Sequence, residues 1–428
     1  MSPALRWGMR TVLPLLLLLA SPATAADAPR DAGSADDPAA SAERAETLER
    51  LRARYLKKVD RCEGRLVEAE GRWVQVCEAP PESVAPTAKD ARRRHRAVGR
   101  LVGRRAKHTR AKARLDALGA PEVEVDVWFA TNRTPDDRHF FGVGDTGTMA
   151  YGIATVRIPA DHPKGDLERE LDIVRVLPLE PEDFYERLSG ATGLDHGMLV
   201  YVHGYNNSFS YAVRRSAQVG HDLELPVVPV LFSWPSHGDT WFSMAKYTYD
   251  ENAAARSSAP FAHVLDDVLS LGAPTVLMAH SMGSRVVSEA LVDLQLRGAP
   301  HRIDELVFAA PDIDATVFAQ RYAATSLARA DRVTLYCADD DRALKLSRQV
   351  HGGYDRLGSC REDSLQTMAH PRLEVVDASQ LYVDLIDHDK VASSPRLLRD
   401  LRHVLVGAPV HADERALVEA GPRYQLPP

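Results

Sequence analysis

From Val123 onward, the chain alternates between short apolar runs and longer stretches with helical periodicity. The apolar runs are rich in β-branched and aromatic residues, as is typical of buried strands. These runs are VEVDVWFA, YGIATVRIP, LDIVRVLPL, MLVYVHG, VVPVLFSW, PTVLMAH, ELVFAAP, RVTLYCA and RLEVVDA. The helices expected among and after the last six are Tyr211–Gly220, Pro260–Leu271, Gly283–Leu296, Ala315–Ala328, Arg342–Val350 and Leu397–Val406. The alternation predicts an α/β fold over residues 121–410, with a mostly parallel central sheet flanked by helices.

The residues before this domain follow another pattern. Apolar residues recur at helical spacing from Leu48 to Val59, and the stretch RLVEAEGRWVQVCE then alternates around Gly71 like a short hairpin. A second helix through the basic stretch that follows would complete a small helix-hairpin-helix accessory segment over residues 43–120. Residues 26–42 contain few apolar groups, which predicts a flexible tether. Residues 411–428 are expected to form a C-terminal tail.

Residues 1–25 have the features of a cleavable secretory signal. Arg6 and Arg10 precede the apolar run TVLPLLLLLA, and small residues follow up to Ala25, after which we expect cleavage. The apolar run of ten residues is too short to cross a bilayer, because a spanning helix needs about twenty. We therefore expect a periplasmic or secreted protein with no transmembrane span after cleavage.

Four cysteines stand in a chain expected in an oxidising compartment, where disulfides form and persist. Three connectivities are possible in principle. Proximity in the sequence favours Cys62 with Cys77 and Cys337 with Cys360, and four buried free thiols are the alternative. A zinc site is not expected, because no C-x-x-C pair is present.

The charge is unevenly distributed along the chain. The formal net charge of −7 becomes −9 when Arg6 and Arg10 leave with the signal. Residues 88–115 hold twelve Lys or Arg and one Asp, a local charge of +11 against −20 on the rest of the mature chain. Such a segment attracts anionic lipid, cell-wall polymer or nucleic acid by electrostatics alone. We favour a solvated basic helix packed against the acidic rest of the chain, with weak contact to an anionic envelope component and no nucleic-acid partner.

One predicted strand-to-helix junction carries candidate chemistry. In PTVLMAHSMGSRVVSEAL the strand ends at Ala279 and the helix begins near Gly283, so Ser281 lies at the corner. Small residues two positions before and after the serine are typical of the G-x-S-x-G nucleophile elbow, whose tight turn raises the hydroxyl clear of the sheet. A serine that caps the helix is the alternative. The small residues on both sides favour the elbow.

A serine hydroxyl becomes a nucleophile when a histidine accepts its proton and an acid orients that histidine. In this fold the acid and then the histidine follow the serine along the chain. Asp341 comes after the next-to-last strand and has the best register to turn back, with Asp339 and Asp340 as close rivals. His388 precedes the closing helix in a loop that can reach the serine.

An oxyanion hole completes such a site with two backbone N–H groups, and each donor usually contributes a few kcal/mol. Met282 follows the nucleophile and supplies one N–H. In VYVHGYNNSF, Gly204 lets the chain turn sharply, so that the N–H of Tyr205 points inward as the second donor. No metal or organic cofactor is implied by these residues.

With these residues assembled, the domain resembles the α/β-hydrolase superfamily, and more narrowly a bacterial esterase/lipase-like hydrolase family whose function is not established. The resemblance covers about Val123 to Gly407 and rests on VWFATNR, YGIATVRIP with the following H and G, HGYNNSF, LFSWPSHG, AHSMGSR, FAAPDID and DRAL. It implies that Ser281, Asp341 and His388 form the catalytic triad.

FAAPDID offers Asp312 and Asp314 as an alternative acid site one strand earlier. The residues together predict a serine hydrolase that cleaves small carboxylic esters through an acyl-enzyme. About twenty residues separate the ELVFAAP and RVTLYCA strands, which leaves room for one helix and favours an open cleft for short or soluble esters. A catalytically inactive hydrolase-fold protein that binds an envelope component, and an acyltransferase, are the alternatives.

Overall fold

The computed structural model describes most of the chain. The described residues are 38–77, 97, 100, 101, 104, 105, 107, 108, 112, 122–159, 162–167, 171–193, 196–238, 244–361, 365, 370, 372–381 and 390–427. The expected secretory signal, residues 1–25, lies outside them, and so does His388.

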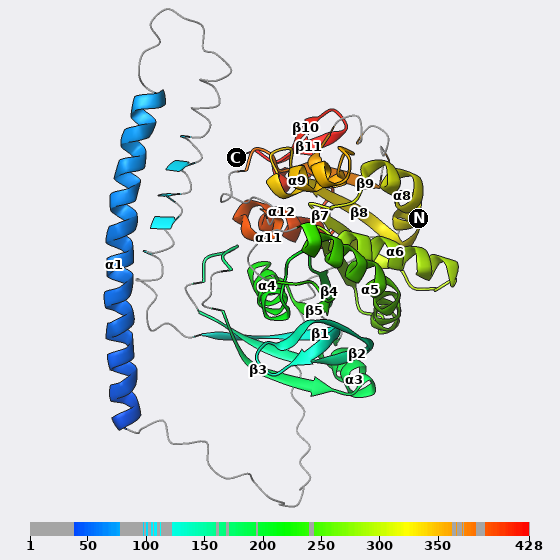
Figure 1. Ribbon diagram of the computed structural model, residues 1–428, viewed down its shortest axis with the longest axis horizontal. Coiled ribbons are helices and arrows are strands. Elements are labelled where there is room, and N and C mark those ends of the chain that lie inside the picture. Colours follow the sequence, from blue (N-terminus) through cyan, green and yellow to red (C-terminus); the bar gives the residue numbers. More distant parts are fainter. Residues whose placement is uncertain are drawn as a thin grey trace, which may run out of the picture.

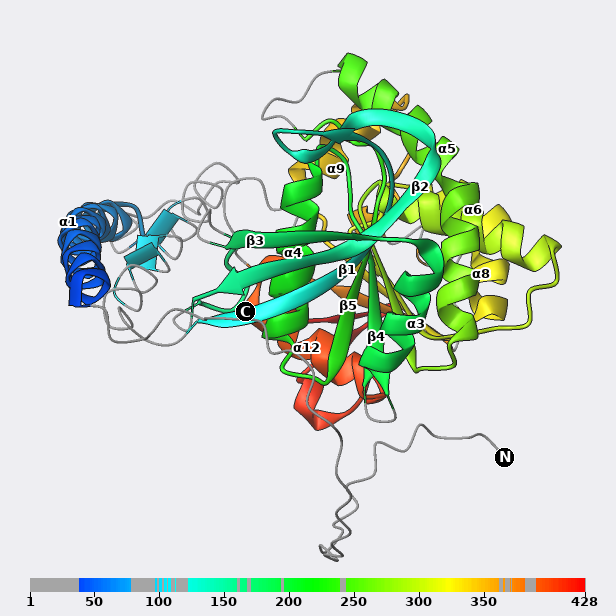
Figure 2. The ribbon, with the colours of Figure 1, turned by 90° about the horizontal axis from the view of Figure 1, so that it is seen from below.

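A sheet of eleven strands forms the centre of the domain (Figures 1 and 2). Its order is β10-β11-β9-β8-β7-β6-β4-β5-β1-β2-β3. The strands are β1 (Val123–Asp136), β2 (Phe140–Ile158), β3 (Asp172–Leu179), β4 (Gly197–Val202), β5 (Val227–Ser233), β6 (Thr275–His280), β7 (Ile303–Ala309), β8 (Ala330–Cys337), β9 (Leu373–Asp377), β10 (Val418–Ala420) and β11 (Arg423–Gln425). The β1–β2, β2–β3 and β10–β11 pairs are antiparallel, and the other pairs are parallel. The mostly parallel sheet that the sequence predicts is confirmed.

Helices cover both faces of this sheet. They are α3 (Pro181–Thr192), α4 (Phe209–Asp222), α5 (Met244–Ser270), α6 (Gly283–Leu296), α7 (Ala315–Val317), α8 (Ala323–Arg329), α9 (Arg342–Val350), α11 (Lys390–Ser393) and α12 (Pro395–Leu405). Side chains of α3, α5, α6 and α8 share a core with one face, and those of α4 and α12 share a core with the other (Figure 2). Successive residues of β4 enter opposite cores, which explains its unbroken apolar sequence.

The order of the strands reverses between β4 and β6. The chain leaves β4 through α4 to β5 on one side, and it leaves β6 through α6 to β7 on the other side. The two crossover helices lie on opposite faces. A crevice outside the carboxyl ends of such neighbouring strands is where open α/β sheets bind ligands. The loops after β4 and β6 therefore mark the expected place of a site.

All nine predicted strands are present, and α6 and α9 have the predicted bounds. Three parts of the domain differ from the prediction. Helix α5 begins well before Pro260, which lies inside it; the prediction placed the proline at the helix start, where its missing N–H costs least. Helix α3 was not predicted. Residues 411–428, expected as a tail, contain strands β10 and β11 of the sheet.

The N-terminal segment differs most. Helix α1 runs unbroken over Pro38–Cys77, so the hairpin predicted around Gly71 is wrong, and the last five residues of the predicted tether are helical (Figure 1). Residues 65–72 are mostly strong helix formers, and the ion pair from Arg72 to Glu68 one turn earlier supports the helix across the glycine. The described residues of the basic stretch are helical too, and Arg105 pairs with Glu70 of α1 at 3.0 Å. Within the described residues, the structure has no helix that is long and apolar enough to cross a membrane.

The two predicted cysteine pairs have opposite outcomes. Cys337 and Cys360 form a disulfide with a Cα–Cα distance of 5.2 Å. Cys62 is free, and the predicted bond from it to Cys77 is wrong. Both residues lie on the straight helix α1, where fifteen residues span about 22 Å, far beyond the roughly 7 Å that a disulfide tolerates between Cα atoms.

Candidate active site

Ser281 occupies a strained turn between β6 and α6. Its φ is 51°, in the left-handed region, which costs a residue with a side chain of the order of 1–2 kcal/mol. Backbone hydrogen bonds hold the turn on both sides: the Ser281 N–H donates to the Ala309 carbonyl at 2.9 Å, and the Ser281 carbonyl accepts from Asp312 N–H at 3.1 Å. The residue is only 2% exposed. This geometry matches the elbow predicted from the sequence.

Two glycines let the end of β4 approach this turn. A Cβ on Gly283 would lie 2.4 Å from the His203 carbonyl oxygen, and a Cβ on Gly204 would lie 2.8 Å from the Cβ of Ser281. Real Cβ atoms do not come this close to such neighbours. The loop after β4 therefore packs directly against Ser281.

This loop was predicted to carry one oxyanion donor, the N–H of Tyr205. The left-handed residue that turns the loop is Asn206, with a φ of 58°, so Gly204 is required for space and not for its backbone conformation. The Asn207 side chain closes the turn by donating to the Gly204 carbonyl at 3.0 Å. The second predicted donor, Met282, is fully buried at the N-cap of α6. The structure thus places the loop that carries Tyr205 next to Ser281, and the role of Tyr205 and Met282 as oxyanion donors stays a prediction.

The buried side chain that holds this loop was not predicted from the sequence. Arg133, at the end of VWFATNR, is 1% exposed. Its guanidinium donates to the Asn207 carbonyl at 2.7 Å, to the Ser236 carbonyl at 2.9 Å and to Ser233 Oγ at 2.9 Å. Burial lowers the pKa of Arg133 to about 9 and the carboxylate of Asp250 opposes this shift, so the side chain remains charged at neutral pH. The motifs VWFATNR, HGYNNSF and LFSWPSHG, which carry the family resemblance, are therefore joined through the hydrogen bonds of Arg133.

Asp341 lies at the carboxyl end of the sheet, after β8. It is 2% exposed and caps α9, because its Oδ1 accepts from Leu344 N–H at 3.0 Å. Of its rivals, Asp339 is exposed and Asp340 is partly exposed. The loop that the Cys337–Cys360 disulfide closes packs on the same region: Gly358 bonds to the backbone after β8 and to the backbone after β7.

The family model for an alpha/beta hydrolase of unknown function (DUF900) matches residues 182–407, more than half of the chain. The chain belongs to this α/β-hydrolase family. The match confirms the resemblance and the fold class that the sequence analysis expected. The matched region contains the loop after β4 that packs against Ser281. It also contains β6 and β8, the strands that precede Ser281 and Asp341. No curated protein matches the sequence.

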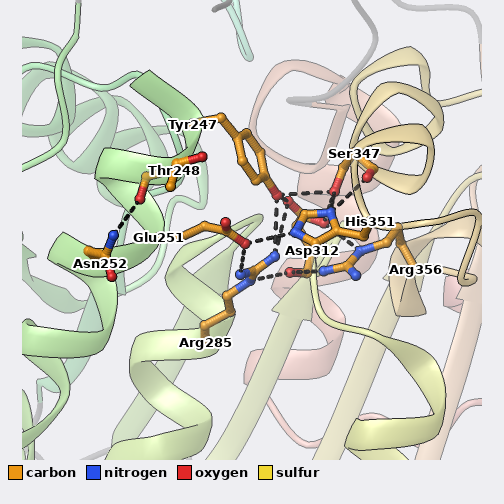
Figure 3. A network of polar contacts seen from close by, with 9 residues as sticks. All are labelled: Tyr247, Thr248, Glu251, Asn252, Arg285, Asp312, Ser347, His351 and Arg356. Atoms are coloured by element: carbon orange, nitrogen blue, oxygen red, sulfur yellow. Dashed lines mark hydrogen bonds and ion pairs between the residues drawn. The ribbon is translucent and has the colours of Figure 1, made fainter. Parts of the chain in front are cut away.

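Asp312, the alternative acid that the sequence offered, is the centre of a buried polar network (Figure 3). Its carboxylate accepts from Arg356 Nε at 2.7 Å, from Ser347 Oγ at 2.6 Å and from the Tyr247 hydroxyl. Burial opposes its charge, but the guanidinium groups of Arg356 and Arg285, together with the hydrogen bonds from Ser347 and Tyr247, hold the pKa of Asp312 below its usual range. These bonds occupy both carboxylate oxygens. Asp314, the other alternative, caps α7 through a bond from Val317 N–H at 3.0 Å.

The network also connects α9 to the nucleophile turn. Ser347 belongs to α9, and the backbone N–H of Asp312 donates to the Ser281 carbonyl. Burial and the charge of Asp312 raise the pKa of Tyr247 above its usual range, so its hydroxyl keeps the proton that it donates. The helix that Asp341 caps is therefore linked to Ser281 through the hydrogen bonds of Ser347 and Asp312.

His388, the predicted base, lies outside the described residues. Two described histidines near the site pair with carboxylates: His237 with Asp250 at 2.9 Å, and His351 with Glu251 at 2.8 Å. His203 is fully buried, and burial together with the charge of Arg133 holds its pKa well below the usual range, so it is neutral. No cluster of three or more His, Cys, Asp or Glu side chains that suits a metal ion occurs in the part of the chain that the structure describes.

Proposed function

We propose that this protein is an exported serine hydrolase that cleaves carboxylic esters through Ser281, His388 and Asp341. The observation that carries the proposal is the left-handed backbone of Ser281 at the β6–α6 corner, with the loop after β4 packed against it. A helix-capping serine has no need of this strained conformation, whereas a nucleophile that must stand above the sheet does.

In the proposed reaction, Ser281 Oγ attacks the ester carbonyl while His388 accepts its proton. Charge develops on the carbonyl oxygen and is stabilised by the backbone N–H groups of Met282 and Tyr205. His388 then protonates the leaving alcohol, and Asp341 stabilises the imidazolium during this step. Water releases the acyl group from Ser281 by the reverse sequence of proton transfers.

Two observations favour Asp341 as the acid of the triad: its side chain is buried, and the carboxylate of its rival Asp312 already accepts hydrogen bonds from other side chains. Asp312 is already bound by Arg356, Ser347 and Tyr247, which supports a structural role. Asp341 is the buried member of the three consecutive aspartates after β8.

The substrate class follows from the segment between β7 and β8. It holds only α7, a five-residue π-helical turn and α8, with no large cap domain. We therefore expect faster turnover of short or soluble esters than of emulsified long-chain lipid. Export is supported by the apolar N-terminal run and by the disulfide, which is typical of oxidising compartments.

Hydrolysis of p-nitrophenyl acetate and p-nitrophenyl palmitate by the purified chain tests this proposal. His388→Ala should abolish turnover, whereas the matched variants His237→Ala and His351→Ala should retain most of it. If His237→Ala loses as much turnover as His388→Ala, then His237, paired with Asp250, is the better candidate for the catalytic base. No turnover of any ester by the wild type would favour an inactive hydrolase fold with a binding role.

A further inference from the structure

Far along the chain from the hydrolase site, two helical stretches enclose a cleft lined with arginines. Its lining comprises Arg65, Glu68, Ala69 and Arg72 of α1 and Ala97, Arg100 and Arg104 of the basic stretch, and we refer to it as the arginine cleft. It encloses about 90 Å³. The α1 residues follow the spacing of one helical face, and so do those of the basic stretch.

The charges in the arginine cleft are poorly balanced. Among its described lining residues Glu68 is the one carboxylate, and this group is already paired with Arg72. Arg65, Arg100 and Arg104 have no carboxylate partner among the residues that the structure describes. Three guanidinium groups thus line a small space in which the described residues offer them no counter-charge.

Helix α1, which packs beside the basic stretch, does not supply the missing negative charge. Helix α1 contains nine Lys or Arg and seven Asp or Glu, so it is itself slightly basic. The basic stretch, residues 88–115, has twelve cations and one acid. The described ion pair between the two, Arg105 with Glu70, lies outside the cleft lining. The basic helix was expected to pack against the acidic rest of the chain, and its described ion pair is with α1, which is itself slightly basic. An anion from outside would relieve the repulsion between the two segments.

We propose that the arginine cleft binds a phosphate group. Guanidinium groups match phosphate oxygens in pairs, and arginine is the preferred residue for such recognition. A space of about 90 Å³ is small beside the roughly 300–1,000 Å³ of pockets that enclose a whole organic ligand. It suits one compact anionic group whose remainder lies in solvent or in a lipid layer. Free phosphate and the headgroup of an anionic phospholipid share this chemistry.

The test compares two variants of the full chain that each lose three positive charges. Arg65→Gln, Arg100→Gln and Arg104→Gln together remove the unpaired arginines of the cleft. Arg54→Gln, Lys57→Gln and Lys112→Gln together remove three exposed cations of the same two segments outside the cleft. Circular dichroism establishes that both variants keep the helical content of the wild type.

Binding is measured by calorimetric titration with inorganic phosphate and by sedimentation with vesicles. The vesicles contain phosphatidylcholine alone, added phosphatidylglycerol, or added oleate as an anion without phosphate. We expect the wild type to bind phosphate or phosphatidylglycerol vesicles, the cleft variant to bind at least about tenfold more weakly, and the control variant to stay within about threefold. Binding of phosphatidylglycerol without free phosphate would identify the headgroup as the ligand.

Three results would overturn the proposal. These are no binding by the wild type, equal weakening in both variants, and equal binding to oleate and phosphatidylglycerol vesicles. The last two are the outcomes of unspecific attraction between a basic surface and any anion. Ester hydrolysis by the cleft variant should equal that of the wild type, because the cleft and the hydrolase site share no residues.

Discussion

Asp341→Asn separates the proposed role of Asp341 in catalysis from its role in the fold. In the structure this carboxylate caps α9 by accepting the Leu344 N–H at 3.0 Å. Asparagine caps helices about as well as aspartate, so the change should alter the free energy of unfolding by less than about 0.5 kcal/mol. The amide cannot stabilise a neighbouring imidazolium, and it favours the wrong tautomer of the histidine. We therefore expect kcat to fall about 10⁴-fold, which corresponds to about 5 kcal/mol of transition-state stabilisation.

The two quantities are measured on the same preparation. Turnover of p-nitrophenyl acetate gives kcat, and urea unfolding gives the stability. Asp341→Ala is the companion variant, because it should lose activity to the same extent and also about 1 kcal/mol of capping energy. Asp340→Asn is the matched control and should retain activity. If Asp341→Asn keeps kcat within about tenfold of the wild type, or if Asp340→Asn is the inactive variant, the assignment of the acid is wrong.

Three further predictions concern groups that surround the elbow. Asp312→Asn should cost about 3–5 kcal/mol of stability in urea unfolding, because it leaves the buried guanidinium of Arg356 without its counter-charge. The lowered pKa of Asp312 means that its stabilisation is complete above the ordinary Asp pKa of about 3.9 and is lost as the pH falls below it, so acid should destabilise the wild type more than this variant. Gly204→Ala should lower kcat about 100-fold, because the new methyl group would lie 2.8 Å from the Cβ of Ser281 and displace the oxyanion loop; unchanged kcat would show that the loop does not need this contact. Cys360→Ser should cost about 3 kcal/mol in urea, since the disulfide closes a loop of 23 residues, and an unchanged midpoint would count against that contribution.

The sequence predicts the sheet and the elbow because both are encoded locally. Buried parallel strands appear as continuous apolar runs, and β6 followed by Ser281 and Gly283 is a single stretch in which strand, corner and helix are adjacent. Proximity in the sequence predicted the disulfide between Cys337 and Cys360, but it also predicted the wrong pair Cys62 and Cys77, because the intervening residues form a straight helix.

The parts that the sequence analysis missed depend on distant partners. Arg133 was visible as a lone cation after an apolar strand, but its acceptors, at Asn207 and Ser236, lie 74 and 103 residues later. The same holds for Asp312, whose counter-charge Arg356 lies 44 residues away. Nothing in the local spacing of these residues indicates that they meet.

The N-terminal error has another cause. Around Gly71 the apolar residues alternate over a few positions, and a short window cannot distinguish this alternation from the face of a long helix. The glycine favoured a turn, whereas the charged pairs one helical turn apart favour the helix that is observed.

Labelling by a fluorophosphonate measures directly whether Ser281 is an activated nucleophile. The probe reacts with serines whose hydroxyl is activated by a neighbouring base. We expect rapid labelling of the wild type, with the adduct located by mass spectrometry on the peptide that contains Ser281, and no labelling of Ser281→Ala. If the folded wild-type protein stays unlabelled, or if the label persists in Ser281→Ala, then Ser281 is not the nucleophile.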